Sequence, residues 1–177
     1  MKNSSKTAMG GMISALSLVI MLLTAVIPYL EYALPAMSGI LLVLMVIEIN
    51  KKWAFGVYAA VGILSLLLAT DKEAAVMYVA FFGYYPVIKA VLESKLPRIA
   101  EWIVKFLIFN VTMVASYFVL IGVFGISMED MNELGKYGPL ILLALGNVVF
   151  LVFDIAITRI ATLYIIKWQK QFRRLFK

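Results

Sequence analysis

Three ionisable side chains lie inside otherwise apolar stretches of this sequence: Lys89, Lys105 and Asp154. At about 1.5 Å of rise per helical residue, Lys89 lies roughly 22 Å from the start of its apolar segment and Asp154 roughly 24 Å from the start of its own. Lys105 comes just after the beginning of another apolar segment. Consecutive segments that alternate in direction would bring all three to one level. An unpaired carboxylate there would be costly or protonated, so we expect Asp154 to pair with Lys89 or Lys105.

This predicted ion cluster is compatible with two kinds of chemistry. One is a proton or coupling site, since ionisable groups inside a membrane are usually functional. The other is a structural clasp between three helices, which the position of the cluster close to the membrane interface favours.

Two amides and a phenol form a second polar group. Asn110 and Asn147 both fall near the middle of apolar segments, and Tyr117 follows Asn110 by two helical turns on the same face. The amides could hydrogen-bond each other between helices, a contact that contributes about 0.6 kcal/mol on average in membranes. They could equally form the wall of a pocket for a small ligand, so both interpretations stay open.

The stretch FFGYYPVIK, residues 81–89, interrupts a fourth apolar segment. Pro86 has no backbone N–H and therefore frees a carbonyl near Phe82, which predicts a kink. Tyr84 and Tyr85 lie too deep for the aromatic belt at the outer interface, at roughly 15 Å from the segment's outer end. The kink could line a cavity with these phenols, or it could only bend the helix.

The composition excludes several classes of protein. The chain is 64% hydrophobic and contains neither Cys nor His, which removes disulfides, thiol chemistry, His-based metal sites and Ser–His machinery. We therefore expect no enzyme activity, no metal and no cofactor. The net charge of +6 does not require a nucleic-acid partner on so hydrophobic a chain.

The hydrophobic residues fall in long runs, which predicts an all-α integral membrane protein with six transmembrane helices in one bundle. A single membrane domain would cover residues 1–177. The second run is short for a span, and the sixth is longer than a bilayer needs. The six predicted spans are residues 8–30, 34–49, 53–69, 74–90, 102–126 and 137–166.

The basic residues predict the orientation. With the N-terminus in the cytoplasm, all of the 16 Lys and Arg residues except Lys72 and Lys136 fall at cytoplasmic ends, as the positive-inside rule requires. Both termini are then cytoplasmic in a multi-pass protein of a plasma membrane. The basic C-terminal segment KWQKQFRRLFK is typical of an amphipathic segment that lies on anionic lipid. The long apolar stretch near the N-terminus favours a retained first span over a cleaved signal peptide.

The first span contains small residues four positions apart, Gly11 and Ala15. This spacing lets helices approach closely. The pair could pack inside the bundle or form a docking face for another membrane protein.

Together, the size, the six spans with cytoplasmic termini, the first span ALSLVIMLLTAVIP with a short second span, and the small-residue motif resemble the S-components of energy-coupling factor (ECF) transporters. That resemblance implies a bacterial subunit that captures a vitamin or similar micronutrient. It implies as partners a transmembrane coupling subunit, docked at Gly11 and Ala15, and two cytoplasmic ATPases. Its substrate site, near the outer face, would add Tyr29 and Glu31 to a set that also contains Tyr84, Tyr85, Asn110, Tyr117 and Asn147.

Two other functions remain open from the sequence. A stand-alone proton-linked carrier or channel would use the cluster around Asp154, although no inverted repeat is visible. A structural subunit of a membrane complex would need only a row of small residues on a helix face that points away from the bundle. No GxxxxGK[ST] phosphate loop occurs in the sequence, so any ATP-driven function requires partner proteins.

Overall fold

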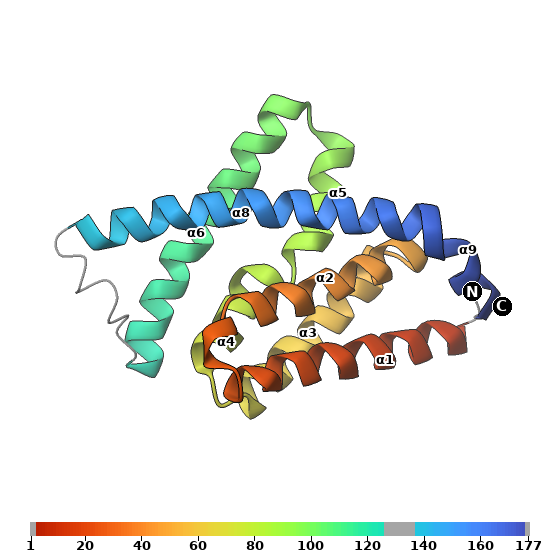
Figure 1. Cartoon of the computed structure of the whole chain (residues 1–177), viewed down its shortest axis with the longest axis horizontal. Helices are drawn as coiled ribbons and strands as arrows, with labels where there is room; N and C mark the ends of the chain where they lie inside the picture. Colours follow the sequence, from red (N-terminus) through yellow and green to blue (C-terminus); the bar gives the residue numbers. More distant parts are fainter. Residues whose placement is uncertain (1–2, 126–136, 176–177) are drawn as a thin grey trace.

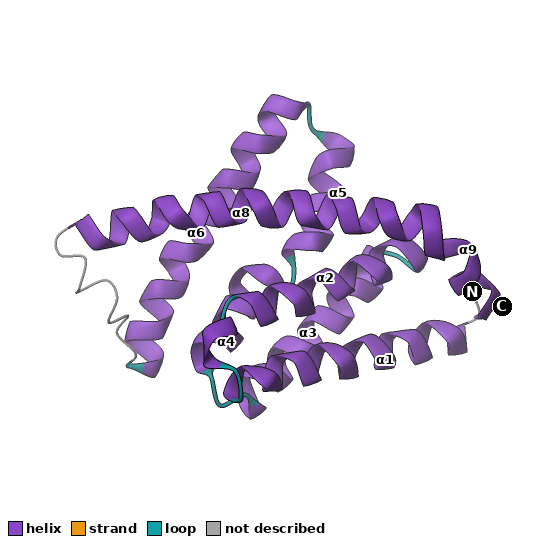
Figure 2. Ribbon diagram, in the orientation of Figure 1, coloured by secondary structure: helices purple, strands orange, loops and turns teal. Residues whose placement is uncertain are grey.

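The computed structural model describes residues 3–125 and 137–175, and these residues are helical apart from short turns, with no strand among them. Figure 2 shows this all-helical architecture. Five helices are long and apolar enough to cross a membrane, and a sixth apolar helix, α2 (Ala33–Glu48), has 16 residues. The all-α class and the membrane-compatible helices are thus present, whereas six complete spans and their orientation remain predictions.

The N-terminal part of the chain forms three neighbouring helices: α1 (Asn3–Leu22), α2 and α3 (Lys51–Leu68). The predicted first span, residues 8–30, is not one helix. α1 ends at Leu22 and is followed by two 3₁₀ turns, η1 (Leu23–Ala25) and η2 (Pro28–Leu30). Pro28 explains the second break, because it offers no N–H to continue the helix.

The predicted fourth span, residues 74–90, is divided. α4 (Lys72–Met77) runs into a π-helical segment, η3 (Tyr78–Phe82), and α5 (Tyr85–Lys95) starts after a turn. The Gly83 amide donates to the Tyr78 carbonyl at 2.8 Å, which closes the wide π turn. Pro86 occupies the first turn of α5, where its missing N–H is tolerated. The sequence therefore encodes a broken helix at this point.

The remaining helices are longer than the sequence suggested or begin elsewhere. α6 (Arg98–Phe124) starts four residues before its predicted span at 102. α8 (Gly138–Leu163) continues through the π-helical segment η5 (Tyr164–Trp168) into α9 (Gln169–Leu175). α5 and α6 form a hairpin, and α8 lies across it (Figure 1). The beginning of α1 and the end of α9 lie at the same end of the molecule.

Buried side chains form two hydrophobic clusters. The first contains aliphatic and Met residues of α1–α3, such as Met21, Leu42 and Val61. The second is largely aromatic and joins η3, α5, α6 and α8. The broken helix supplies residues to both clusters, Tyr78 to the first and Phe81 to the second. FFGYYPVIK therefore lies at the junction between the two parts of the bundle.

Candidate functional site

The centre of the candidate site is the carboxylate of Asp154 on α8. Its Oδ1 lies 2.7 Å from Lys89 Nζ on α5 and 3.2 Å from Lys105 Nζ on α6. The three side chains are 4%, 3% and 1% exposed. The pairing predicted for Asp154 is thus present, and it involves both lysines rather than one.

Two further carboxylates extend the cluster. Glu93 Oε1 lies 2.5 Å from Lys89 Nζ and 3.0 Å from Lys105 Nζ, and Glu101 Oε1 lies 2.6 Å from Lys105 Nζ. The sequence analysis missed both glutamates, although each stands four residues from a lysine on its own helix, the spacing of helical ion pairs. We define the ion cluster as Lys89, Glu93, Glu101, Lys105 and Asp154.

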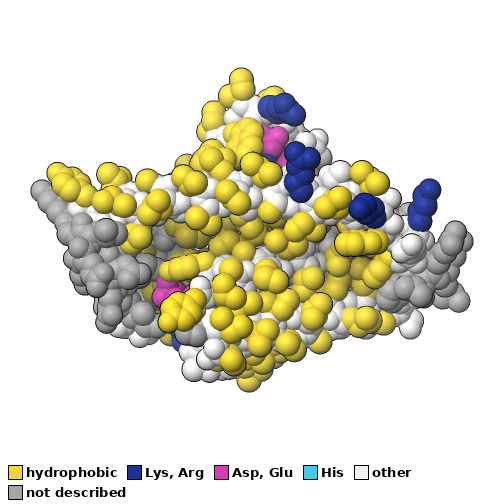
Figure 3. All heavy atoms as spheres, viewed as in Figure 1, with side chains coloured by type: hydrophobic (Ala, Val, Ile, Leu, Met, Phe, Trp, Pro, Cys, Tyr) yellow, Lys and Arg dark blue, Asp and Glu magenta, His cyan; other side chains and the backbone are white. Residues whose placement is uncertain are grey.

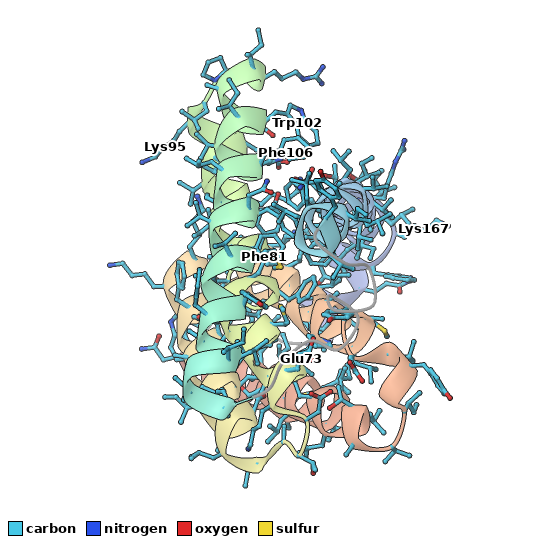
Figure 4. The ribbon with its side chains drawn as sticks, turned by 90° about the vertical axis from the view of Figure 1, so that its left-hand side faces the viewer. Glu73, Phe81, Lys95, Trp102, Phe106 and Lys167 are labelled. Carbon is cyan, nitrogen blue, oxygen red and sulfur yellow. The ribbon has the colours of Figure 1, made fainter. Side chains whose placement is uncertain are left out.

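Aromatic side chains surround the ion cluster. The buried Tyr85 hydroxyl donates to Asp154 Oδ1 at 2.6 Å, and the Tyr85 ring stacks on Phe81 with centroids 4.6 Å apart. Lys105 Nζ lies 5.0 Å from the ring centre of Trp102, within cation–π range. In Figure 4, Trp102 and Phe106 extend from α6 near α8, whereas Lys95 points away from the bundle. The rings exclude solvent from Asp154 and the two lysines and so strengthen their attraction, whereas the Glu93 side chain is 40% exposed.

The arrangement holds three helices together. Asp154 accepts from Tyr85 and is paired with both lysines, and each lysine is also paired with a glutamate. Removing one member of a buried ion pair is strongly destabilising, because the partner charge remains in an apolar environment. Every member of the ion cluster has an oppositely charged partner, although three carboxylates and two lysines leave one negative charge in excess. This geometry is compatible with the clasp interpretation, and a proton-transfer role would require one of its contacts to open.

The two predicted mid-membrane amides hydrogen-bond each other. Asn110 Nδ2 donates to Asn147 Oδ1 at 2.9 Å, and Asn147 Nδ2 donates to Asn110 Oδ1 at 3.0 Å. Each amide also donates to the carbonyl one turn earlier in its own helix. Both donor hydrogens of each side chain are therefore used between and within α6 and α8, which matches the inter-helix interpretation.

The other predicted substrate-binding residues do not gather at one place. Tyr29 is 95% exposed in η2, and Glu31 is half-buried in the turn before α2. Tyr84 is half-buried edge-on to Tyr58, and Tyr117 is half-buried against Phe118 of its own helix. A shallow apolar hollow of about 440 Å³ does adjoin Asn110.

The kink in FFGYYPVIK is filled by protein. A Cβ added at Gly39 of α2 would overlap the Phe82 carbonyl, and one added at Gly83 would lie 2.6 Å from Tyr58 Cδ2. The Tyr58 hydroxyl donates to the Val79 carbonyl at 2.7 Å. Glycines thus allow α2 and α3 to pack directly on the broken helix, and the bent-helix interpretation of FFGYYPVIK describes the observed packing.

The small residues of α1 face outward. Gly11 and Ala15 are exposed, and a Cβ added at Gly11 would meet no atom within 4 Å. The adjacent Gly10 does the internal packing, against Met45 and Val57. The pair that the sequence singled out is therefore not used by the described part of the bundle.

Within the described residues, no group of three or more Asp and Glu side chains is placed to hold a metal ion. Comparison with protein-family models, curated proteins and solved structures found no match for this chain.

Proposed function

We propose that this protein is a membrane-embedded substrate-capture subunit of the ECF type, which takes up a vitamin or similar micronutrient with energy from partner ATPases. The observation that carries the proposal is the outward face of α1, where Gly11 and Ala15 are exposed and a Cβ added at Gly11 would meet no atom within 4 Å. Small residues four apart allow a second helix to approach closely within lipid. A transmembrane coupling subunit is the partner that this face would receive.

The proposal assigns different tasks to the two parts of the bundle. The α1–α3 part presents the docking face, and its aliphatic core includes Met9 and Ile13 from the buried side of α1. Ligand capture would use the outer end of the molecule, where Tyr29 and Glu31 lie next to the start of α2. Asn110, Asn147 and Tyr85 already have protein partners, so a ligand role for them requires those bonds to be exchanged.

The test is co-purification of the tagged chain from its own host in mild detergent, with partners identified by mass spectrometry. Two ATPases and a multi-span coupling subunit should be recovered with the wild type and lost with Gly11→Trp. Gly122→Trp on α6 is the matched control, because Gly122 is also exposed and open. Recovery of the chain alone, or loss of partners with both variants, contradicts the proposal.

A stand-alone proton-linked carrier is the second candidate, and the ion cluster favours it. Three carboxylates face two lysines there, so one proton would neutralise the set. In liposomes, that function requires ligand-driven proton uptake that Asp154→Asn abolishes without any partner protein.

A further inference from the structure

A second charged region lies at the turn between α2 and α3, at the end of the molecule where the described chain begins and ends (Figure 1). The turn carries a shallow hollow of about 540 Å³. Its lining residues are Val46, Ile49, Asn50, Lys51 and Lys52. Apolar residues of α2 thus form one wall of the hollow, and two lysines of α3 form the other.

The charges that line this hollow are positive, and the nearest acidic residue in the sequence, Glu48, accepts from the Tyr164 hydroxyl at 3.4 Å. Neither Lys51 nor Lys52 forms an ion pair with a described residue. All ion pairs among the described residues belong to the ion cluster. Asn50 Oδ1 is occupied by the Trp53 amide at 3.0 Å. The hollow therefore presents two free ammonium groups, which attract an anion.

The surroundings indicate what kind of anion would fit. Val46 and Ile49 are half-buried and offer apolar contact directly beside the lysines. In Figure 3, hydrophobic side chains cover much of the visible face, and basic side chains lie over the α5–α6 hairpin as well as toward the end where the termini lie. A molecule with a phosphate and an acyl chain would match both walls, and basic pockets at the cytoplasmic ends of membrane helices bind such headgroups.

We propose that the hollow at the α2–α3 turn binds an anionic phospholipid, with its phosphate at Lys51 and Lys52 and the start of an acyl chain against Val46 and Ile49. This site is independent of the transport proposal, because it uses neither the face of α1 nor the ion cluster. Soluble phosphate would share the contact with the lysines but not the contact with the apolar wall.

The test compares retained lipids by native mass spectrometry after equilibration with phosphatidylglycerol or phosphatidylcholine. A lysine near an anionic surface contributes about fivefold in affinity, so Lys51→Gln with Lys52→Gln should weaken phosphatidylglycerol retention by up to about thirtyfold. Phosphatidylcholine retention should not change. Lys95→Gln with Arg98→Gln is the matched control, because this exposed basic pair lies on the α5–α6 turn.

Three results would overturn the proposal. Equal phosphatidylglycerol retention by the wild type and the Lys51/Lys52 variant would show that the hollow is not the site. Equal losses in the control pair would show diffuse attraction to a basic surface. A third result would identify soluble phosphate as the ligand: inorganic phosphate displaces phosphatidylglycerol completely and raises the melting temperature as much as phosphatidylglycerol does. Unchanged melting in phosphatidylcholine verifies that both variants fold.

Discussion

The two parts of the bundle are held together by different interactions. α1–α3 pack through aliphatic and Met side chains and close glycine contacts, with a pair of buried serine hydroxyls, Ser17 and Ser38, each bonded to the other's carbonyl. α5, α6 and α8 instead enclose the ion cluster within rings such as Phe81 and Phe150. Lipid provides little hydrophobic drive between helices, so packing and polar bonds decide association. The association of α1–α3 therefore depends on the shape of the packed surfaces, and the association of α5, α6 and α8 depends on charge.

The largest expected effect tests the charge-based part. Asp154→Ala leaves Lys89 and Lys105 without their central carboxylate and should lower the free energy of unfolding by about 3–5 kcal/mol. Thermal or denaturant unfolding in mild detergent measures this change. Asp71→Ala, which removes a helix cap at the start of α4, should lower it by only about 1 kcal/mol. Equal losses would mean that the ion cluster is no more important than an ordinary cap.

The next effect tests how closely α2 of the shape-based part packs on the broken helix. Gly39→Ala places a methyl group on the Phe82 carbonyl, which is backbone and cannot turn away. The overpacking should lower the free energy of unfolding by about 1–3 kcal/mol. Gly11→Ala is the control, because the space beside Gly11 is open. If Gly39→Ala is as well tolerated as Gly11→Ala, the close approach of α2 to the broken helix does not contribute to stability.

A third variant tests whether the aromatic surroundings support the ion cluster. Tyr85→Phe keeps the ring on Phe81 and removes the 2.6 Å bond to Asp154. A hydrogen bond to a charged group contributes about 1.5–3 kcal/mol, and two lysines remain to hold the carboxylate, so a loss near the lower figure is expected. Double-mutant cycles with Asp154→Asn should show coupling. Additive effects would mean that the Tyr85 hydroxyl does not contribute to the stability of the ion cluster.

The smallest effect concerns the amide pair. A double-mutant cycle of Asn110→Leu and Asn147→Leu should give a coupling energy of about 0.6 kcal/mol, the average for such bonds in membranes. Steric trapping in bicelles can resolve a difference of this size. A coupling several times larger would place Asn110 and Asn147 beside the ion cluster as a second polar clasp between α6 and α8.

Sequence patterns predicted the helices better than the contacts between them. Long apolar runs indicate helices because backbone groups in lipid must bond internally, and these runs gave all the main helices to within a few residues except at breaks. Proline signalled the break near Pro86, whereas the end of α1 at Leu22 lies inside the predicted first span and was not predicted. No residue pattern signalled the π turn before Gly83, because its wider hydrogen bond depends on packing by Gly39 and Tyr58.

Prediction from the sequence was limited in the same way at the candidate site, where single residues were easier to predict than the contacts between helices. Asp154 and its two lysines could be found from sequence, because charges in apolar segments need partners. Glu93 and Glu101 resemble ordinary interfacial acids, and only the α5–α6 hairpin brings Glu93 within 3.0 Å of Lys105. Whether Asn110 and Asn147 meet each other or a ligand depends on the crossing of α6 and α8, which no local pattern specifies.

The sequence by itself determined an all-helical, membrane-compatible chain without thiol or histidine chemistry, because composition and apolar run length depend only on residue types. It also determined that Asp154 needs a basic partner. The tertiary structure alone decided that both lysines and two glutamates share that role, that Gly10 faces inward and Gly11 outward, and that the broken helix joins two different cores. These outcomes depend on how helices rotate and cross, and such geometry results from all the packing contacts together.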